Sequence, residues 1–395
     1  MANSYTFNQI ATILNQIVAD AQGRTADITT TPRDTSQFVT MAQSALSVGT
    51  DPIMHSISQL INRSIFVARP YKATLDILKW DNVTWGNAVR KLTPIFSDAA
   101  QTNPEYDSAP EDASSADQWT VKRPKTLQTN FIGAEQWQVQ EPTVFEDQLN
   151  NAFRGPDELA QFLGMQRTAV LNEIEQEEEQ LARMTISSFV ASKISADSTN
   201  VIHLLTEYNT ATGLALTATT VYQPGNFEAF IRWASARMRE IGMMMKERSI
   251  KFHQNLTGIN IMRHTPTDYQ RCIIYSKAIG QIDSMVRNSL FNEWLALPNH
   301  TEINFWQNIN APDSINITPP VMSATGNVSK ASAAVSQANI FAVLYDRDAM
   351  GYSIFNQGMN QTPINAKARY YNTFHHFVKR YMLDMTENGV VFLLD

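Results

Sequence analysis

The sequence predicts an α+β protein. Three patterns carry this prediction: an amphipathic helix pattern over residues 156–193, two β-rich stretches on either side of a polar segment at 97–117, and an alternating strand pattern over 369–383. The chain has 395 residues, of which 43% are hydrophobic and 17% charged, and these values are ordinary for a folded protein with one large or two modest cores.

The sequence predicts that the N-terminal part forms an arm. Residues 5–21 have apolar side chains every three to four positions, which is typical of a helix with one apolar side, and a polar, Thr-rich connector follows at 23–35. A second such helix is expected over 51–65, with Pro52 at its first position. We therefore divide this part into an N-terminal arm, 1–50, and an arm-to-body helix region, 51–79.

The next part predicts an extended β-hairpin loop over 80–140. Strand-like stretches rich in Trp and Val lie on both sides of the acidic segment 97–117, which reads as an unstructured tip. Because a two-stranded hairpin is marginally stable alone in water, we expect this arm to lie on a neighbouring molecule.

A short basic run, Lys122-Arg123-Pro124-Lys125, lies on the arm. It could contact nucleic acid, but a charge-pairing contact to an acidic neighbour or a protected strand edge explains it more simply. We take Trp119, Lys122, Arg123 and Lys125 as candidate contacts between subunits.

Residues 156–193 give the strongest helix prediction. The stretch begins with Gly155-Pro156-Asp157-Glu158, where a proline and two acids suit a helix N-terminus, and continues with a one-sided apolar stripe. An unbroken helix would be about 57 Å long and would act as a beam. Five acids near its middle could form a cation site, but we favour a solvated face. They are Glu173, Glu175, Glu177, Glu178 and Glu179.

The remaining elements are a helix over 226–248, a helix near 265–279 within a mixed α/β lobe, and strands at 338–350 and 369–383. Asn388-Gly389 predicts a turn into a final strand at 390–394, and thus a C-terminal β-hairpin. The Met243-Met244-Met245 triplet offers either an adaptable contact surface or core filling, and we favour core filling.

No sequence motif predicts catalysis or metal binding. The G-x-S-x-G, G-x-x-x-x-G-K, G-x-G-x-x-G and H-E-x-x-H patterns are absent, and His375-His376 would point to opposite faces of a strand. One cysteine, Cys272, excludes an internal disulfide and reads as buried. The net charge of -7 argues against a groove that binds nucleic acid tightly. We therefore expect no catalytic, cofactor or metal residues.

The order of these elements resembles the major capsid proteins of tailed bacteriophages with the Hong Kong 97-like fold, especially those of short-tailed phages. The resemblance extends from about residue 50 to 395 and is most specific in four stretches. They are SQLINRSIFVARPY before the arm, DQWTVKRPKTLQTNFIGAEQW after it, FRGPDELAQFLGMQRTAVLNEIEQEEEQLARMTISSFV as the spine helix, and the ending LYDRDAMGYSIFNQGMNQTPINAKARYYNTFHHFVKRYMLDMTENGVVFLLD.

The resemblance implies an N-terminal arm, an extended loop (E-loop), a spine helix at 156–193, a peripheral domain at 141–249, an axial domain at 250–340, and a return to the peripheral domain at 341–395. It also implies a structural protein, not an enzyme, that self-assembles as hexamers and pentamers into an icosahedral shell enclosing a double-stranded DNA genome.

The resemblance further implies partner proteins and a cellular location for assembly. Many relatives have an N-terminal scaffolding segment that is cut off. Here we expect no such segment, and therefore a separate scaffolding protein, a portal protein, and assembly in the host bacterial cytoplasm without a membrane. Some relatives join Lys to Asn covalently between subunits, for which Lys122 or Lys125 with Asn372 would serve. We do not favour that bond.

Two other functions stay open. An encapsulin-type nanocompartment shell protein has the same fold but encloses a cargo enzyme, which would co-purify with it in the absence of nucleic acid. A non-viral β-rich binding protein is supported only by the abundant aromatic residues and would be a stable monomer with a saturable ligand.

Overall fold

The computed structural model describes most of the chain after residue 124 and little before it. The described residues are 40, 74–80, 90–95, 125–130, 132–141, 143–147, 156–196, 198–223, 225–256, 261–280, 300–323, 325 and 327–395. The helices predicted at 5–21 and 51–65 and the acidic segment 97–117 lie outside these residues.

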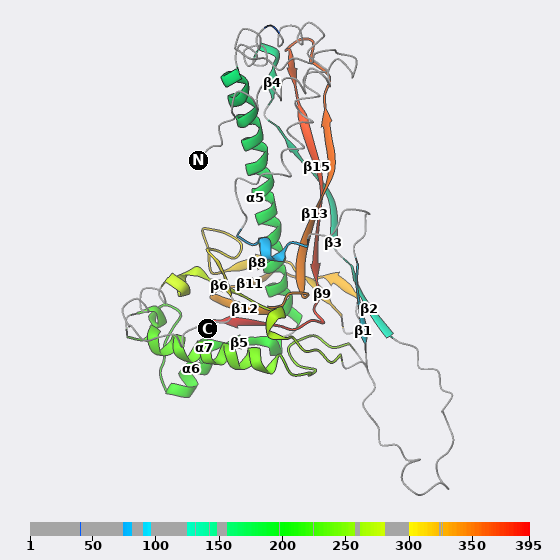
Figure 1. The fold of residues 1–395 in the computed structure, drawn as a ribbon. Coiled ribbons are helices and arrows are strands. Elements are labelled where there is room, and N and C mark those ends of the chain that lie inside the picture. Colours follow the sequence, from blue (N-terminus) through cyan, green and yellow to red (C-terminus); the bar gives the residue numbers. More distant parts are fainter. Residues whose placement is uncertain are drawn as a thin grey trace, which may run out of the picture. The chain divides into compact units, whose positions relative to one another are not determined.

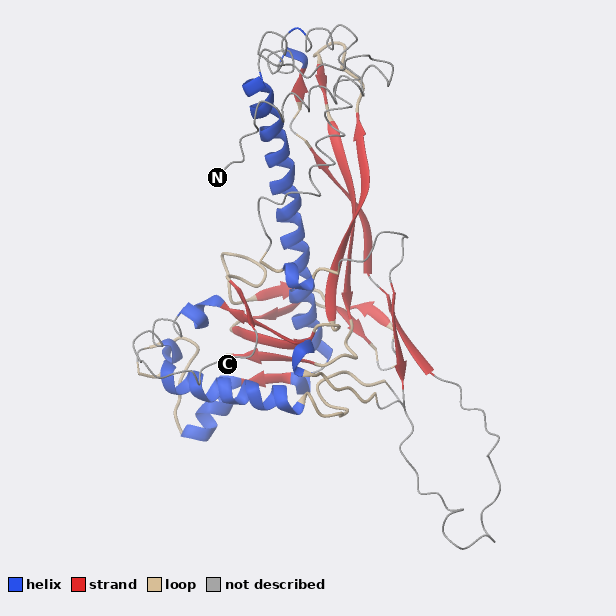
Figure 2. Cartoon of the chain, viewed as in Figure 1, coloured by secondary structure: helices blue, strands red, loops and turns tan. Residues whose placement is uncertain are grey.

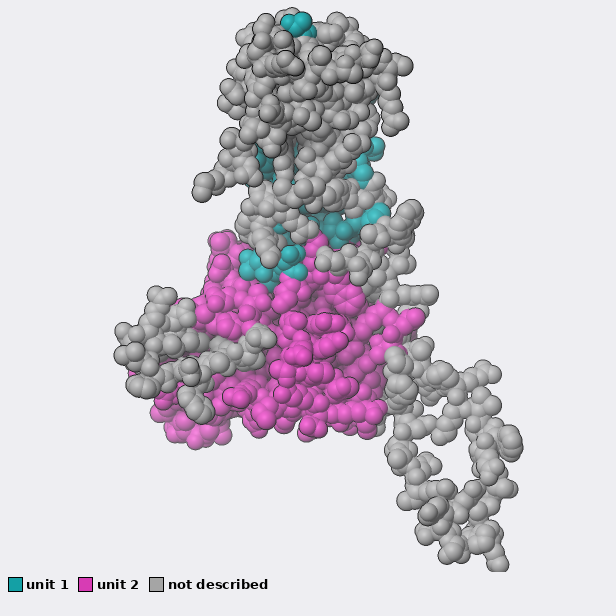
Figure 3. Space-filling model, viewed as in Figure 1, with its two compact units in different colours: residues 1–76, 134–180, 354–379 teal, residues 77–133, 181–353, 380–395 magenta. Residues whose placement is uncertain are grey.

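The chain divides into two compact units, coloured separately in Figure 3. Unit 1 comprises residues 1–76, 134–180 and 354–379, and unit 2 comprises residues 77–133, 181–353 and 380–395. Each unit thus combines segments that are far apart in the sequence.

Unit 2 is built on a mixed five-stranded sheet in the order β5-β16-β12-β6-β7. Its strands are β5 (Val201–His203), β6 (Gln270–Tyr275), β7 (His300–Ile303), β12 (Ile340–Asp346) and β16 (Gly389–Leu393). The central strand β12 is antiparallel to both β16 and β6, whereas β5 and β7 are added in parallel at the two edges. The helices α6 (Leu204–Thr212) and α7 (Phe227–Met244) belong to the same unit (Figure 1).

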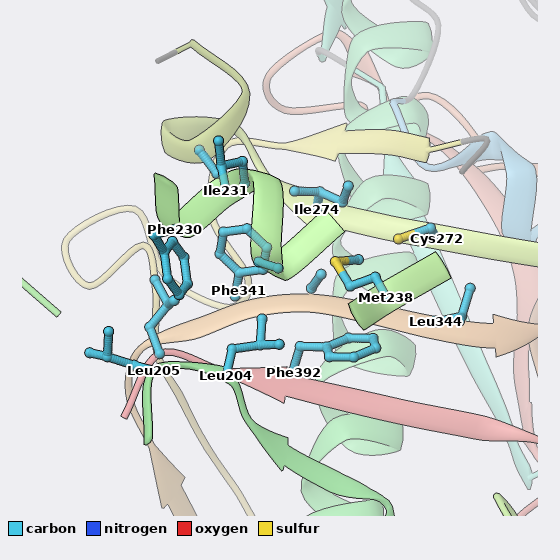
Figure 4. Packing of buried hydrophobic residues seen from close by; sticks show 14 of the residues in the cluster. Leu204, Leu205, Phe230, Ile231, Met238, Cys272, Ile274, Phe341, Leu344 and Phe392 are labelled. Carbon is cyan, nitrogen blue, oxygen red and sulfur yellow. The ribbon is translucent and has the colours of Figure 1, made fainter. Parts of the chain in front are cut away.

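The core of unit 2 lies between α7 and this sheet. Phe230 and Met238 of α7 belong to one buried hydrophobic cluster with Phe341 of β12 and Phe392 of β16 (Figure 4). All seven residues of β12 are buried, which explains why this strand reads as a continuous apolar run without alternation. The prediction that Cys272 is buried is confirmed, since it is 2% exposed on β6.

The helix predicted near 265–279 is wrong over most of its length. Residues 267–269 form a single 3-10 turn, η4 (Thr267–Tyr269), and residues 270–275 form β6. A short apolar run such as Cys272-Ile273-Ile274 fits a buried helix or a buried strand equally well, and pairing with β12 and β7 decides for the strand.

Smaller β-pairs complete unit 2. The predicted hairpin arm is confirmed at its base, where β1 (Arg90–Ile95) pairs antiparallel with β2 (Lys125–Asn130). Two further antiparallel pairs are β8 (Ile315–Ile317) with β11 (Val335–Gln337), and β9 (Pro320–Met322) with β10 (Val328–Lys330). Short 3-10 turns are η1 (Asp76–Leu78), η2 (Ser198–Asn200) and η3 (Thr220–Tyr222).

The predicted beam helix is confirmed as α5 (Pro156–Ala196), the long helix in Figure 2. Its 41 residues correspond to roughly 60 Å at 1.5 Å per residue. The expected one-sided stripe does not hold at the C-terminal part, because every residue from 185 to 193 is buried. A helix buried on all sides is a core element rather than a surface one.

A three-stranded sheet has the strand order β13-β15-β3, and most residues of these strands belong to unit 1. Its strands are β3 (Ile132–Gln140), β13 (Met350–Gln361) and β15 (Thr373–Leu383), and a short pair joins β4 (Val144–Phe145) to β14 (Tyr370–Tyr371). The division between the units falls within these three long strands and within α5.

The predicted C-terminal β-hairpin is wrong. Strand β15 belongs to the three-stranded sheet and β16 to the five-stranded sheet, so the turn between them joins two different sheets. The Asn388-Gly389 pair serves packing instead. A Cβ on Gly389 would lie 2.6 Å from Cζ of Phe189, so only glycine lets α5 approach this strand so closely.

The predicted domain boundaries also differ from the units. Helices α6 and α7 were expected in the domain 141–249, separate from a lobe at 250–340, but they pack on the same core as β6 and β12. The final strand β16 likewise belongs to unit 2. Strands that are adjacent in a sheet but distant in the sequence cannot be assigned to one domain from composition alone.

Candidate functional site: an anchored hairpin base and an acidic cavity

The hairpin base in unit 2 is held by a lysine. Successive side chains of a strand point to opposite faces, so Leu92 and Lys91 of β1 lie on different sides of the strand. Leu92 is 57% exposed, whereas the side chain of Lys91 is only 13% exposed. The Nζ atom of Lys91 donates hydrogen bonds to the carbonyl oxygen of Asp348 at 3.0 Å, to Oδ2 of Asp384 at 3.0 Å and to Oε1 of Glu387 at 2.7 Å. All three donor positions of the ammonium group are therefore used.

The acceptors of Lys91 lie around the turn that follows β15. Thr386 donates to Oδ1 of Asp384 from its backbone nitrogen at 3.0 Å and from its hydroxyl at 2.6 Å. From the other side, Arg263 donates to the carbonyl oxygen and the hydroxyl of Thr386 and lies 3.4 Å from Glu387. We call Lys91, Arg263, Asp384, Thr386 and Glu387 the Lys91 cluster.

The charges of the Lys91 cluster shift one another's pKa values. Burial alone would lower the pKa of Lys91, but the nearby carboxylates of Asp384 and Glu387 outweigh burial and raise it. Burial opposes ionisation of Asp384 too, yet Lys91 and the Thr386 hydrogen bonds hold the pKa of Asp384 below its usual value. For Glu387 burial prevails and its pKa is raised. Lys91 and Asp384 thus stabilise each other's charged form.

The Lys91 cluster fixes the base of the hairpin to the body of unit 2. Lys91 and Glu387 are separated by 296 positions in the sequence, so their contact is a purely tertiary one. No local pattern in the sequence marks either residue, and neither was among the predicted contact residues.

Of the four predicted contact residues, the structure describes only Lys125. Trp119, Lys122 and Arg123 lie outside the described residues. Lys125 begins β2, where its backbone is paired with Ile95 at the end of β1. Ile95 and Lys125 therefore lie at the same end of the two-stranded ribbon. The role of the four predicted residues as contacts between subunits stays a prediction.

The acidic face predicted on α5 is only partly solvated. Glu175 and Glu178 are 4% and 6% exposed, so the expected solvated face is wrong at these positions. Glu177 is half-buried and accepts a hydrogen bond from Nζ of Lys379 on β15 at 2.6 Å. Spacing along a helix shows which residues share a face but does not show what covers that face.

Next to this ion pair, unit 1 contains a cavity of about 570 Å³. Its lining residues come from β3, the chain that follows β3, and α5, and they are Trp137, Gln138, Val139, Gln140, Glu141, Thr143, Glu173 and Glu177. Nζ of Lys379 lies 3.9 Å from the centroid of the Trp137 ring. The buried Glu141 carboxylate lies 2.6 Å from Nε2 of His375. Of the cavity's three carboxylates, Glu177 has a cationic neighbour in Lys379 and Glu141 an imidazole neighbour in His375, and Glu173 is the third.

The described residues offer no evident chemical site beyond these contacts. Within them, no three His, Cys, Asp or Glu side chains are grouped as a metal ion would require. None of the helices in the described part of the chain is long and apolar enough to cross a membrane. Burial raises the pKa of the Cys272 thiol to about 12, so this group is not poised for nucleophilic chemistry.

The fold is that of phage capsid proteins. One similar structure is described as the capsid of Staphylococcus phage Andhra, with 10% identity, a TM-score of 0.51, and coverage of 81% of this chain and 83% of that chain. Another is a chain in the structure of the head fiber and inner core protein gp22 of native bacteriophage P68, with 11% identity, a TM-score of 0.50, and coverage of 80% and 83%. The expected Hong Kong 97-like capsid fold is confirmed.

The family follows from the sequence itself. The model of the Phi29-like phage major capsid protein family matches residues 14–393, and the chain belongs to this family. It is thus a structural protein of a phage virion, with its place in the capsid shell. No curated protein matches the sequence significantly.

Proposed function

We propose that this chain forms the closed icosahedral head of a tailed phage as hexamers and pentamers, with double-stranded DNA inside. The family match over residues 14–393 is the observation that carries this proposal, and it favours a phage capsid over the encapsulin and binding-protein alternatives. A net charge of -7 suits a wall that repels packaged DNA rather than binding it.

The parts of the subunit are proposed to have the following roles. Helix α5 is the spine, the β1–β2 ribbon is the base of the extended loop, and the sheet β13-β15-β3 belongs to the peripheral domain. The five-stranded sheet with α6 and α7 forms the axial domain that lines the centre of each capsomer. Trp119, Lys122, Arg123 and Lys125 contact an acidic surface of a neighbouring subunit.

The proposed partners are a separate scaffolding protein, which directs closure of the shell in the host cytoplasm, and a portal protein at one vertex. Both follow from the family resemblance. The role is purely structural, without a catalytic step or a cofactor.

The test is to express the full chain alone and together with the scaffolding protein encoded by the same phage. Negative-stain electron microscopy and sedimentation would then size the products. Closed shells or capsomer-sized rings are expected. Compact monomers under both conditions would overturn the shell proposal, and co-purification of an enzyme inside nucleic-acid-free shells would favour the nanocompartment.

A further inference from the structure

The C-terminal end of α7 carries an ordered surface in unit 2 that has no role so far. After α7 the chain turns, and Ser249 and Arg263 then bond to each other through two backbone hydrogen bonds of 2.9 Å. The backbone nitrogen of Thr265 also donates to the carbonyl oxygen of Met245 at 2.7 Å. We call residues 239–251 and 261–263 the α7-end platform.

The α7-end platform exposes four large apolar side chains. Met243 is 58% exposed, Met244 39%, Ile250 44% and Met262 48%. Ile250 follows Ser249 and Met262 precedes Arg263, so these two lie opposite each other across the antiparallel bridge. Of the methionine triplet only Met245 is buried, so core filling accounts for one of its three residues. Exposed methionines suit an adaptable contact surface.

The platform is also basic. Its exposed cations Arg239, Lys246, Arg248 and Lys251 form no ion pair within the described residues, and they outnumber its two exposed acids, Glu240 and Glu247. Arg239 and Met243, four residues apart on α7, lie on one side of the helix. Other arginines of α7 are paired: Arg232 with Glu228, and Arg237 with Glu207 and Glu240. Unpaired cations beside exposed apolar side chains fit a ligand that is both acidic and partly apolar.

The chain itself contains such a ligand. The segment 97–117, SDAAQTNPEYDSAPEDASSAD, has six acids and no Lys or Arg, and it adds apolar contacts through Tyr106, two prolines and five alanines. In the sequence it lies between β1 and β2, which pair with each other. Phosphates of DNA would satisfy the cations of the platform but leave its methionines without a partner, so a protein segment fits better.

We propose that the acidic segment 97–117 of one copy docks on the α7-end platform of a second copy. The Asp and Glu side chains pair with Arg248, Lys251 and their basic neighbours, and Tyr106 packs against the methionines. The inference rests on the proposed function, because a shell needs contacts that join copies, and a segment bound to the platform of its own chain would join none.

The test uses two complementary charge reversals in the full chain. A platform variant carries Arg248→Glu and Lys251→Glu, and a tip variant carries Glu111→Lys and Asp112→Lys. Each variant alone brings like charges together and should need roughly tenfold or more higher protein concentration to form shells. Mixed in equal amounts, each altered surface meets an oppositely charged one on the other variant, so assembly should recover towards the wild-type concentration.

Controls separate docking from folding and from net charge. Lys330→Glu with Lys367→Glu makes the same change in net charge as the platform variant at exposed positions outside the platform, and it should assemble as the wild type does. Buried Cys272 should stay unreactive towards a thiol reagent in every variant that has folded.

The outcomes are distinct. If both reversals assemble like the wild type, the docking inference is overturned and the shell function stands. Recovery only when both reversals are in one chain, and not in the mixture, overturns docking on a second copy. A platform reversal that leaves assembly intact but lowers DNA retention indicates nucleic acid as the occupant and also overturns the inference. Failure of the wild type to form any shell overturns the proposed function itself.

Discussion

Units 1 and 2 each use a lysine to join distant segments, but in different surroundings. In unit 2, Lys91 is 13% exposed and contacts Asp384, which is 2% exposed. In unit 1, Lys379 and Glu177 are 18% and 22% exposed, and Lys379 also lies over the ring of Trp137. A buried ion pair leaves an uncompensated charge when one partner is removed, whereas in a partly exposed pair water solvates the charge that remains. The same type of contact should therefore matter much more in unit 2.

The largest expected effect is that of Lys91→Met. It removes the cation beside the buried Asp384 and should lower the free energy of unfolding by about 3 kcal/mol or more. The measurement is the reaction rate of Cys272, the single cysteine, with a thiol reagent, because that rate follows the population of molecules in which unit 2 is open. A loss of about 3 kcal/mol should accelerate the reaction roughly a hundredfold. An unchanged rate would show that the Lys91 cluster does not stabilise unit 2.

The next effect concerns close packing inside unit 2. Gly389→Ala places a Cβ 2.6 Å from Cζ of Phe189, which is fully buried, and should cost about 1–3 kcal/mol. Denaturant unfolding of the subunit measures the loss. The double variant Gly389→Ala with Phe189→Leu should recover part of it, since leucine leaves room for the added methyl group. A double variant less stable than either single one would contradict the steric explanation.

A smaller effect is expected for the matching lysine of unit 1. Lys379→Met keeps the apolar contact with Trp137 but loses the ion pair with Glu177 and the cation above the ring, and should cost about 1 kcal/mol or less. Its Cys272 reaction rate should stay close to that of the wild type, since Cys272 lies in unit 2. If Lys379→Met were as destabilising as Lys91→Met, exposure would not be what separates the two pairs.

The smallest effect is a pH dependence. The pKa of Glu387 is higher in the folded protein than in the unfolded chain, where it is about 4.5. Glu387 therefore contributes fully to stability below about pH 4.5, and this contribution is lost as the pH rises through the folded pKa. Asp384, whose pKa is lowered, contributes above about 3.8 and loses its contribution as the pH falls through its folded pKa. Glu387→Gln should therefore flatten the stability profile just above pH 4.5. Denaturant midpoints measured at several pH values test this, and an unaltered profile would contradict the role of Glu387.

The sequence predicts elements well where one periodic pattern is long. The beam helix was predicted at 156–193 and is α5, 156–196, because a proline and acids mark its start and its apolar spacing runs for many turns. The prediction fails where the pattern is short. Residues 270–275 were assigned to a helix, although their pairing with β12 makes them a strand. The sequence also does not show what surrounds a helix. The Ser and Thr residues between 185 and 192 suggest exposure but are buried, and Ser192 donates a hydrogen bond to the carbonyl oxygen of Pro320.

The candidate site was the least predictable part. We predicted the basic residues on the arm as contacts because they form a run in the sequence. Lys91 lies between ordinary strand residues, and its partner Glu387 is almost 300 positions away. Asn388-Gly389 misled for a related reason. The pair is typical of hairpin turns, but here the Asn388 side chain donates to Thr265 and lies 3.1 Å from Nδ1 of His253. Such roles depend on tertiary neighbours that no local pattern encodes.

The position of β16 affects when the subunit can become complete. This strand is formed by residues 389–393, yet it lies inside the five-stranded sheet between β5, formed by residues 201–203, and β12, formed by residues 340–346. The sheet of unit 2 therefore stays open until a segment far along the sequence reaches strands that precede it. Pairing between such distant segments is slow because the chain between them has to close into a loop first, so completion of this sheet sets the pace at which a subunit becomes ready to join a shell.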